Sequence, residues 1–252
     1  MSAPYTAPAK RTTGARSRAL WSPLALIAAL LAYGNGSAWL ATRRSTEVPL
    51  RFNWAHVAML SVVIAWAGLG RFSARELGLA PARIRRSLLS GLALAAVPGL
   101  VIRPVLSLPV IARRLAVPEI DRLSRAQIAR LLLGQYLIGS ALFEEVAFRG
   151  LLQAMLARTF DPGRTVLLTS GAFALWHTLI VWHNVARLRA PSVLRPFLTA
   201  AALCALFTFG ALLGWLRHRT DHLAGAVVAH WLAIVAIVLF IRRRGQPFNA
   251  SP

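Results

Sequence analysis

The stretch LLLGQYLIGSALFEEVAFRG, from Leu131 to Gly150, is the most informative part of the sequence. It starts as an apolar run and ends with two adjacent carboxylates, Glu144 and Glu145, followed by Arg149. An ionisable side chain at membrane depth costs ~2.5–3.5 kcal/mol on insertion scales, and such side chains usually face the interior of a helix bundle. We therefore expect a membrane helix whose charged end is buried. The alternative is a helix end at the membrane surface, where the charges reach water.

The composition supports a membrane protein. Of the 252 residues, 57% are hydrophobic and 15% are charged, whereas about a quarter of the residues of a soluble domain are charged. Long apolar runs alternate with short arginine-rich segments, and a bilayer crossing needs ~20 apolar residues. The sequence predicts an all-α fold, a polytopic membrane helix bundle of about seven to eight transmembrane helices. We expect a multi-pass protein of a bacterial cell membrane.

The apolar runs give approximate helix bounds. Glycines around Asn35 are expected to break the first helix, and prolines are expected to kink or break the third. A tail at residues 1–19 is expected to be basic and disordered, residues 20–245 to form one membrane-embedded domain, and residues 246–252 to form a second tail. The expected helices are Leu20–Ala41, Trp54–Gly70, Ser87–Ala112, Ala126–Phe143 with an amphipathic continuation over Val146–Thr159, Arg164–Val181, Arg195–Leu216 and Asp221–Ile241.

The net charge of +21 could indicate either of two kinds of partner, nucleic acid or anionic lipid. A strongly basic balance can indicate nucleic-acid binding. Here, however, arginines sit at the ends of apolar runs, as at Arg43, Arg85 and Arg242. Arginines in such places reach the interface and attract anionic lipid head groups. We therefore expect membrane lipids as partners and no nucleic acid.

The two glutamates have different local surroundings. Glu145 and Arg149 are four residues apart with the acid first, which is the favourable order for an ion pair on a helix. Glu144 lies about 100° around the helix from Glu145. It has no local partner, so its partners are expected on other helices.

Two histidines lie deep in apolar runs of the second half, His177 and His230. Sites in helix bundles are assembled from side chains on facing helices. Glu144, His177 and His230 could hold and deprotonate a water, or they could bind zinc with water as the fourth ligand. One histidine could instead donate to a developing oxyanion. All three arrangements indicate hydrolysis inside the membrane, with zinc or with no cofactor.

Other patterns point to nothing more specific. His218 and His222 have metal-like spacing but sit in a polar turn, where we expect them to be solvated, and His56 is expected in the core or lining a pore. No HExxH helix and no GxSxG elbow is present in the sequence.

Three motifs resemble those of the CPBP (CAAX protease and bacteriocin-processing) intramembrane proteases, a family that includes the type II CAAX prenyl endopeptidases. EEVAFRG, from Glu144 to Gly150, resembles the family's EExxxR motif, and FALWH, from Phe173 to His177, resembles its FxxxH motif. His230 is similar to the start of the third motif, HxxxN. ARELGL, from Ala74 to Leu79, is similar to the family's upstream pattern.

The resemblance implies roles for these residues. Glu144 would activate water with His177 as its partner, and His230 would assist at the oxyanion or complete a metal site. Glu145, Arg149 and Phe173 would support the site. The substrate would be a membrane-embedded or lipidated peptide, such as a prenylated CAAX-type chain.

The third motif is incomplete, because Ile234 stands where the family has asparagine. Isoleucine cannot donate to an oxyanion, and losing one such donor typically costs ~10²–10³ in rate. Asn184, Trp231 or backbone amides could substitute. A second hypothesis is a catalytically impaired relative that acts as a membrane binding or immunity-type protein. A third is a proton-coupled transporter, although the sequence lacks the internal repeat common in transporters.

Overall fold

A computed structural model describes residues 13–44, 54–107, 118–188 and 191–245. These residues form an all-α bundle, and the only strand-like pairing among them is an isolated bridge between Leu79 and His222. The first half contains α1 (Thr13–Arg44), α2 (Trp54–Leu69), the short η1 (Pro81–Arg83), α3 (Ile84–Ser107) and α5 (Pro118–Asp121).

One long helix runs from Arg125 to Ala157 and includes both glutamates. Its consecutive parts are α6 (Arg125–Arg130), η2 (Leu131–Leu142), α7 (Phe143–Glu145), η3 (Val146–Leu152) and α8 (Gln153–Ala157). A reciprocal cap starts it, because the Ser124 hydroxyl accepts the Gln127 amide while the Gln127 side chain accepts the Ser124 amide. Such a cap satisfies two of the donors that a helix start leaves free.

The last part of the bundle contains α9 (Pro162–Trp176), α10 (Thr178–Arg187), η4 (Ser192–Leu194), α11 (Arg195–Thr220) and α12 (Ala224–Gly245). Asp161 caps α9 by accepting the Arg164 amide, and Pro162 occupies the first turn. Both choices favour a helix start at this point.

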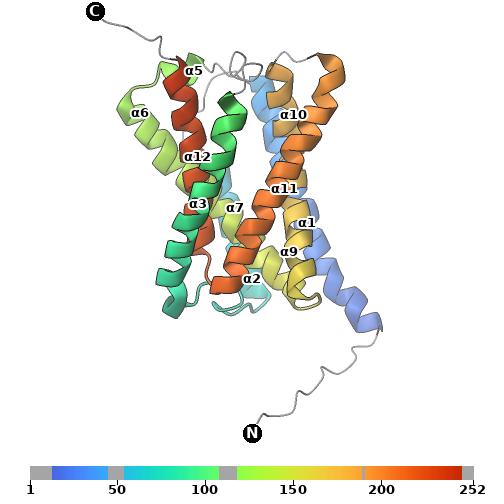
Figure 1. Cartoon of the computed structure of the whole chain (residues 1–252). Coiled ribbons are helices and arrows are strands. Elements are labelled where there is room, and N and C mark those ends of the chain that lie inside the picture. The colour runs from blue at the N-terminus through green and yellow to red at the C-terminus, as the bar shows by residue number, and fades with distance from the viewer. Residues whose placement is uncertain (1–12, 45–53, 108–117, 189–190, 246–252) are drawn as a thin grey trace, which may run out of the picture.

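Figure 1 shows the long helix running through the middle of the bundle, with α7 between two groups of helices. In one group α3 lies against α12, and in the other α11 lies against α9 and α10. The glycines Gly91 and Gly225 bring α3 and α12 together, because a Cβ at Gly91 would collide with the Gly225 backbone. The glutamates are therefore covered from several sides.

The protein is an integral membrane protein. Four of the described helical segments are long and apolar enough to cross a bilayer: Ser22–Arg43, Arg125–Ala157, Ser192–Thr220 and Ala224–Arg242. The α9–α10 pair, bent by 48°, gives a fifth if it is one span. Within the described ranges this is fewer than the seven to eight that we expected, and α2 is shorter than these spans.

Several expected boundaries were wrong. Helix α1 begins at Thr13, so residues 13–19 are helical, and it runs without interruption past Asn35. Helix α3 continues through its prolines to Ser107. The helix expected over Arg164–Val181 is instead broken at His177. The rest of the expected N-terminal tail, the end of the third predicted helix and the C-terminal tail lie outside the described residues.

At one end of the bundle, polar contacts tie the α2–α3 connector to its neighbours. Glu76 accepts two bonds from the Arg158 guanidinium at 2.9 and 3.0 Å and one from the Ser73 amide at 2.8 Å. The Ser73 amide, followed by the Ser73 hydroxyl and then the Arg158 side chain, holds the pKa of Glu76 below its ordinary value despite some desolvation. Arg217 donates to the Glu76 carbonyl. Glu76 therefore links the connector to α8 and α11.

Candidate functional site

Both glutamates are buried in the long helix, with Glu144 6% exposed and Glu145 fully buried. The helix is wider than an α-helix on either side of them, because η2 and η3 have π-helical hydrogen bonding. Widened turns of this kind occur frequently at functional sites. The alternative that the pair lies at the membrane surface in water does not fit this burial.

Glu145 is the centre of a buried polar cluster. Its Oε1 accepts from Arg149 Nη1 at 2.9 Å, which is the ion pair expected from the spacing. The same oxygen lies 2.9 Å from Nδ1 of His230. His230 was expected to serve Glu144, so its hydrogen bond to Glu145 corrects that expectation.

Arg149 is fully buried and has three kinds of contact. Besides the Glu145 ion pair, its Nη2 donates to the Gly210 carbonyl at 3.1 Å, and its guanidinium lies over the Phe173 ring at 4.2 Å. A Cβ at Gly210 would lie 3.0 Å from Nη2, so the glycine makes room for this contact. Arg149 thereby ties the part of the long helix around Glu145 to α9 and α11.

Glu144 points in a different direction and contacts different groups. Ser140, one turn earlier, donates its hydroxyl to Oε1 at 2.7 Å. Oε2 lies 3.6 Å from Nε2 of His177 and has no hydrogen-bond partner among the described residues. His177 was expected from the sequence and Ser140 was not, although the i, i+4 spacing of Ser140 to Glu144 is the local signal for this bond.

The tautomer of His177 follows from its other nitrogen. Nδ1 lies 2.8 Å from the Phe173 carbonyl oxygen, which can only accept, so Nδ1 carries a proton. In the neutral ring Nε2 is then an acceptor. Two acceptors, Nε2 and Glu144 Oε2, therefore face one another across 3.6 Å. A water lying beside both atoms could donate one hydrogen to each.

Phe173 lies among the charged and basic groups of the site. Its ring is edge-to-face with His177 at 4.6 Å and with His230 at 5.9 Å between centroids. Phe173 therefore contacts Arg149 and both histidines, and its ring lies between the two imidazoles. The supporting position suggested by the FxxxH motif thus lies within the site.

An aromatic wall from the first part of the chain packs against Phe143, the residue before Glu144. Tyr33 of α1 and His56 of α2 are edge-to-face at 5.7 Å, and His56 lies 5.4 Å from the Phe143 ring. The Tyr33 hydroxyl and His56 Nδ1 are buried without hydrogen-bond partners within the described part of the chain. A Cβ at Gly139 would lie 3.8 Å from His56 Nδ1, so this nitrogen faces the long helix. No motif around His56 indicated its place here.

The residues that could replace the missing asparagine differ in availability. Ile234 packs in an apolar cluster with Leu132 and Tyr136. Trp231 donates its Nε1 to the Leu132 carbonyl at 2.9 Å, so its donor is already used. Asn184 is exposed on α10.

The three expected zinc ligands are not arranged as a metal site. His230 is hydrogen-bonded to Glu145, and no group of three acidic, histidine or cysteine side chains among the described residues could hold a metal ion. His218 contacts the Trp215 ring, and His222 is buried with its Nδ1 accepting the Ala224 amide at 3.0 Å. The expectation that both are solvated was therefore wrong for His222, and burial lowers the pKa of its imidazole.

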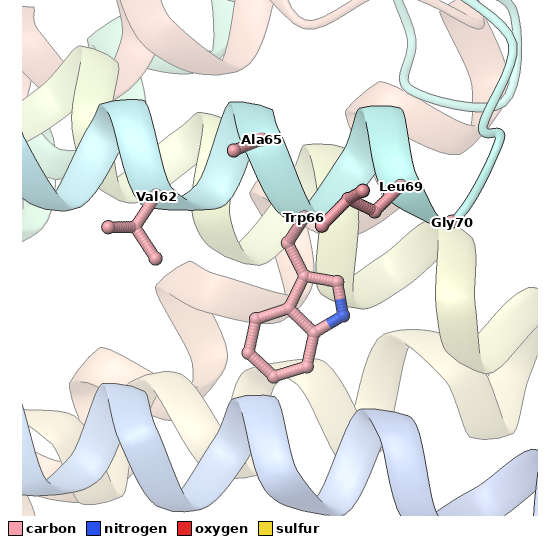
Figure 2. A pocket seen from close by; sticks show the side chains of 5 residues that line it. All are labelled: Val62, Ala65, Trp66, Leu69 and Gly70. Atoms are coloured by element: carbon pink, nitrogen blue, oxygen red, sulfur yellow. The ribbon is translucent and has the colours of Figure 1, made fainter.

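A separate apolar hollow of about 480 Å³ lies at the end of α2. Figure 2 shows Trp66 pointing from α2 toward α1 across it. Its remaining lining residues are Val62, Ala65, Leu69 and Gly70. None of the site residues lines it, so this hollow is distinct from the polar cluster.

Comparison with protein families matches residues 126–236 to the family model described as type II CAAX prenyl endopeptidase Rce1-like. No similar curated protein and no similar solved structure was found. The matched range runs from the long helix to α12. Tyr33, Asn35 and His56 lie before it.

Proposed function

We propose that the protein is an intramembrane endopeptidase in which Glu144 and His177 activate water, since residues 126–236 match the model of the Rce1-like type II CAAX prenyl endopeptidases. The observation that carries the proposal is the pair of facing acceptors, Glu144 Oε2 and His177 Nε2, 3.6 Å apart on different helices. The substrate is a membrane-embedded or prenylated peptide. Residues in contact with the reacting water are therefore Glu144 and His177.

The proposed reaction is general-base hydrolysis. A water donates one hydrogen to Glu144 and the other to His177 Nε2. Glu144 takes the first proton as the water oxygen bonds to the peptide carbonyl carbon, and the carbonyl oxygen becomes an oxyanion. The carbonyl then re-forms, the C–N bond breaks, and Glu144 returns the proton to the leaving amine. Atoms and charge balance, with a carboxylic acid and an amine as products.

His230, Glu145 and Arg149 have a supporting role in this proposal. Because His230 Nδ1 bonds to Glu145, its Nε2 edge is held in one orientation. When both ring nitrogens carry a proton, Nδ1 donates to Glu145 and Nε2 can donate to the oxyanion. The Arg149 ion pair in turn holds Glu145 in place.

The oxyanion donor that Ile234 cannot supply has a candidate in His56. Its Nδ1 is buried, lacks a partner within the described residues and faces the long helix near Gly139. The His56 ring and the Glu144 carboxylate are near enough to interact electrostatically. We propose that His56 Nδ1 donates a hydrogen bond to the substrate carbonyl oxygen as it becomes the oxyanion.

Ile234 favours one other function, a catalytically impaired relative that binds a membrane peptide without cleaving it. Cleavage assays separate the two. Purified wild type, Glu144→Gln and His177→Ala are incubated in detergent with a farnesylated CAAX peptide and with an unmodified transmembrane peptide. The peptidase proposal expects cleavage by wild type alone, and cleavage that Glu144→Gln leaves unchanged would overturn it. Binding without cleavage by all three would favour the impaired relative.

A further inference from the structure

The break between α9 and α10 has an unusual hydrogen-bond arrangement. In a continuous helix the Leu179 amide would donate to the Leu175 carbonyl. Here both groups bond to Asn35 of α1: Leu179 N donates to Oδ1 at 3.0 Å, and Nδ2 donates to the Leu175 oxygen at 3.1 Å. The Leu175 oxygen also accepts the Thr178 hydroxyl at 2.9 Å. One side-chain amide thus takes the place of the missing backbone bond.

Asn35 is itself held in position. Its Nδ2 also donates to the Leu31 carbonyl at 3.1 Å, one turn earlier in α1. The side chain therefore makes three of the four hydrogen bonds that a primary amide can make. The preceding Gly34 allows the close approach, because a Cβ there would collide with the Trp176 indole. The Gly34–Asn35 pair therefore packs closely against the end of α9.

The bonds matter because the break lies in an apolar helix pair. In lipid, broken helices are tolerated only where other groups satisfy the freed backbone atoms. His177 is the residue at the break, with φ −91° and ψ 3°, and it joins the two helices at an angle of 48°. Without Asn35, the Leu175 and Leu179 groups would satisfy each other by closing the helix.

We propose that Asn35 is a positioning residue that holds the α9–α10 break open, so that His177 Nε2 stays at Glu144. The inference rests on the proposed function and extends it to a residue of α1, which lies outside the family match. Closing the break would rotate and displace His177, whereas the glutamates on the long helix would stay in place.

The activity test uses Asn35→Leu, which has a similar size but forms no side-chain hydrogen bonds. A displacement of about 1 Å at a catalytic group can cost ~10²-fold, so kcat is expected to fall by about that factor while KM stays near wild type. Asn35→Asp keeps the shape and the acceptor for Leu179, and should lose less. The matched control is Ser37→Ala, because Ser37 bonds only to the Gly34 carbonyl of its own helix.

The structural test measures the break directly. Spin labels replace the exposed Arg164 and Arg187, near the two ends of the pair, in a Cys204→Ala background that removes the exposed native thiol. Helices of 15 and 10 residues that straighten from 48° lengthen the end-to-end distance by about 3 Å at 1.5 Å per residue. Asn35→Leu should show this lengthening and Ser37→Ala should not.

The outcomes are distinct. Wild-type kcat in Asn35→Leu would overturn the inference, and so would a lower kcat with an unchanged label distance, because the loss would then not come from the break. If wild type and Glu144→Gln cleave equally, the proposed function fails instead. The label distance would still decide whether Asn35 sets the break.

Discussion

The buried ion pair predicts a large loss of stability on removing one partner. Replacing Glu145 by glutamine keeps its shape but leaves the Arg149 guanidinium without its carboxylate, and both side chains are fully buried. Breaking a buried pair in this way costs about 3–5 kcal/mol. His230 loses its charged partner at the same time, since its Nδ1 bonds to the same oxygen.

The expected change is measurable as a melting temperature in detergent. For a chain of about this size, 1 kcal/mol corresponds to roughly 2–4 °C, so Glu145→Gln should melt roughly 6–20 °C below wild type. The double variant with Arg149→Met should be less destabilised than the sum of the two single variants, because the uncompensated charge is then absent.

The chain supplies its own control. Arg83 and Asp221 form an ion pair at 2.7 Å, but their side chains are 46% and 35% exposed. Exposed pairs contribute about 0–1 kcal/mol, so Arg83→Gln should change the melting temperature by no more than a few degrees. Equal melting temperatures for Glu145→Gln and Arg83→Gln would show that the Glu145 cluster is not a buried, coupled one.

Three further predictions concern packing, pH and the aromatic wall. Gly91→Ala should destabilise the folded protein by about 1–3 kcal/mol, because the new methyl group would collide with the Gly225 backbone. Gly36→Ala is the control, because a methyl group there meets nothing within 4 Å and should not destabilise the protein. Equal melting temperatures for the two variants would contradict this. The folded-state pKa of Glu76 lies below its ordinary 4.5, so its stabilisation is present above pH 4.5 and is lost as the pH falls through the folded value. Thermal melts across pH should therefore show a smaller acid loss in Glu76→Gln, and identical profiles would exclude the effect. His56→Ala should lower kcat in the peptide assay by ~10²–10³-fold. A kcat equal to that of wild type would show that His56 has no part in the reaction.

Local geometry made part of the site predictable. The Glu145–Arg149 pair depends only on spacing within one helix, and the structure contains it. The separate direction of Glu144 follows from the same geometry. Which histidine meets which carboxylate depends instead on how α9 and α12 pack against the long helix. For that reason the bond from His230 to Glu145 was not predicted.

The least predictable feature was the break at His177. FALWHTLIVW contains no glycine or proline, so no local signal marks an interruption. The Gly34, Asn35 and Gly36 triplet does carry such a signal, but α1 is continuous there. Asn35 instead bonds to Leu175 and Leu179, more than 130 residues away in the sequence. A break that is satisfied by a distant side chain can be seen only once the helices are packed.

The most direct test of water activation by Glu144 is the ratio of kcat/KM between wild type and Glu144→Gln on a farnesylated CAAX peptide and a transmembrane peptide. Glutamine keeps the shape and can still accept the Ser140 hydroxyl, but it cannot take a proton from water. A positioned general base contributes about 10²–10⁴-fold, so kcat/KM should fall by that factor on whichever peptide wild type cleaves. Equal kcat/KM for the two proteins would contradict the assignment of Glu144 as the base.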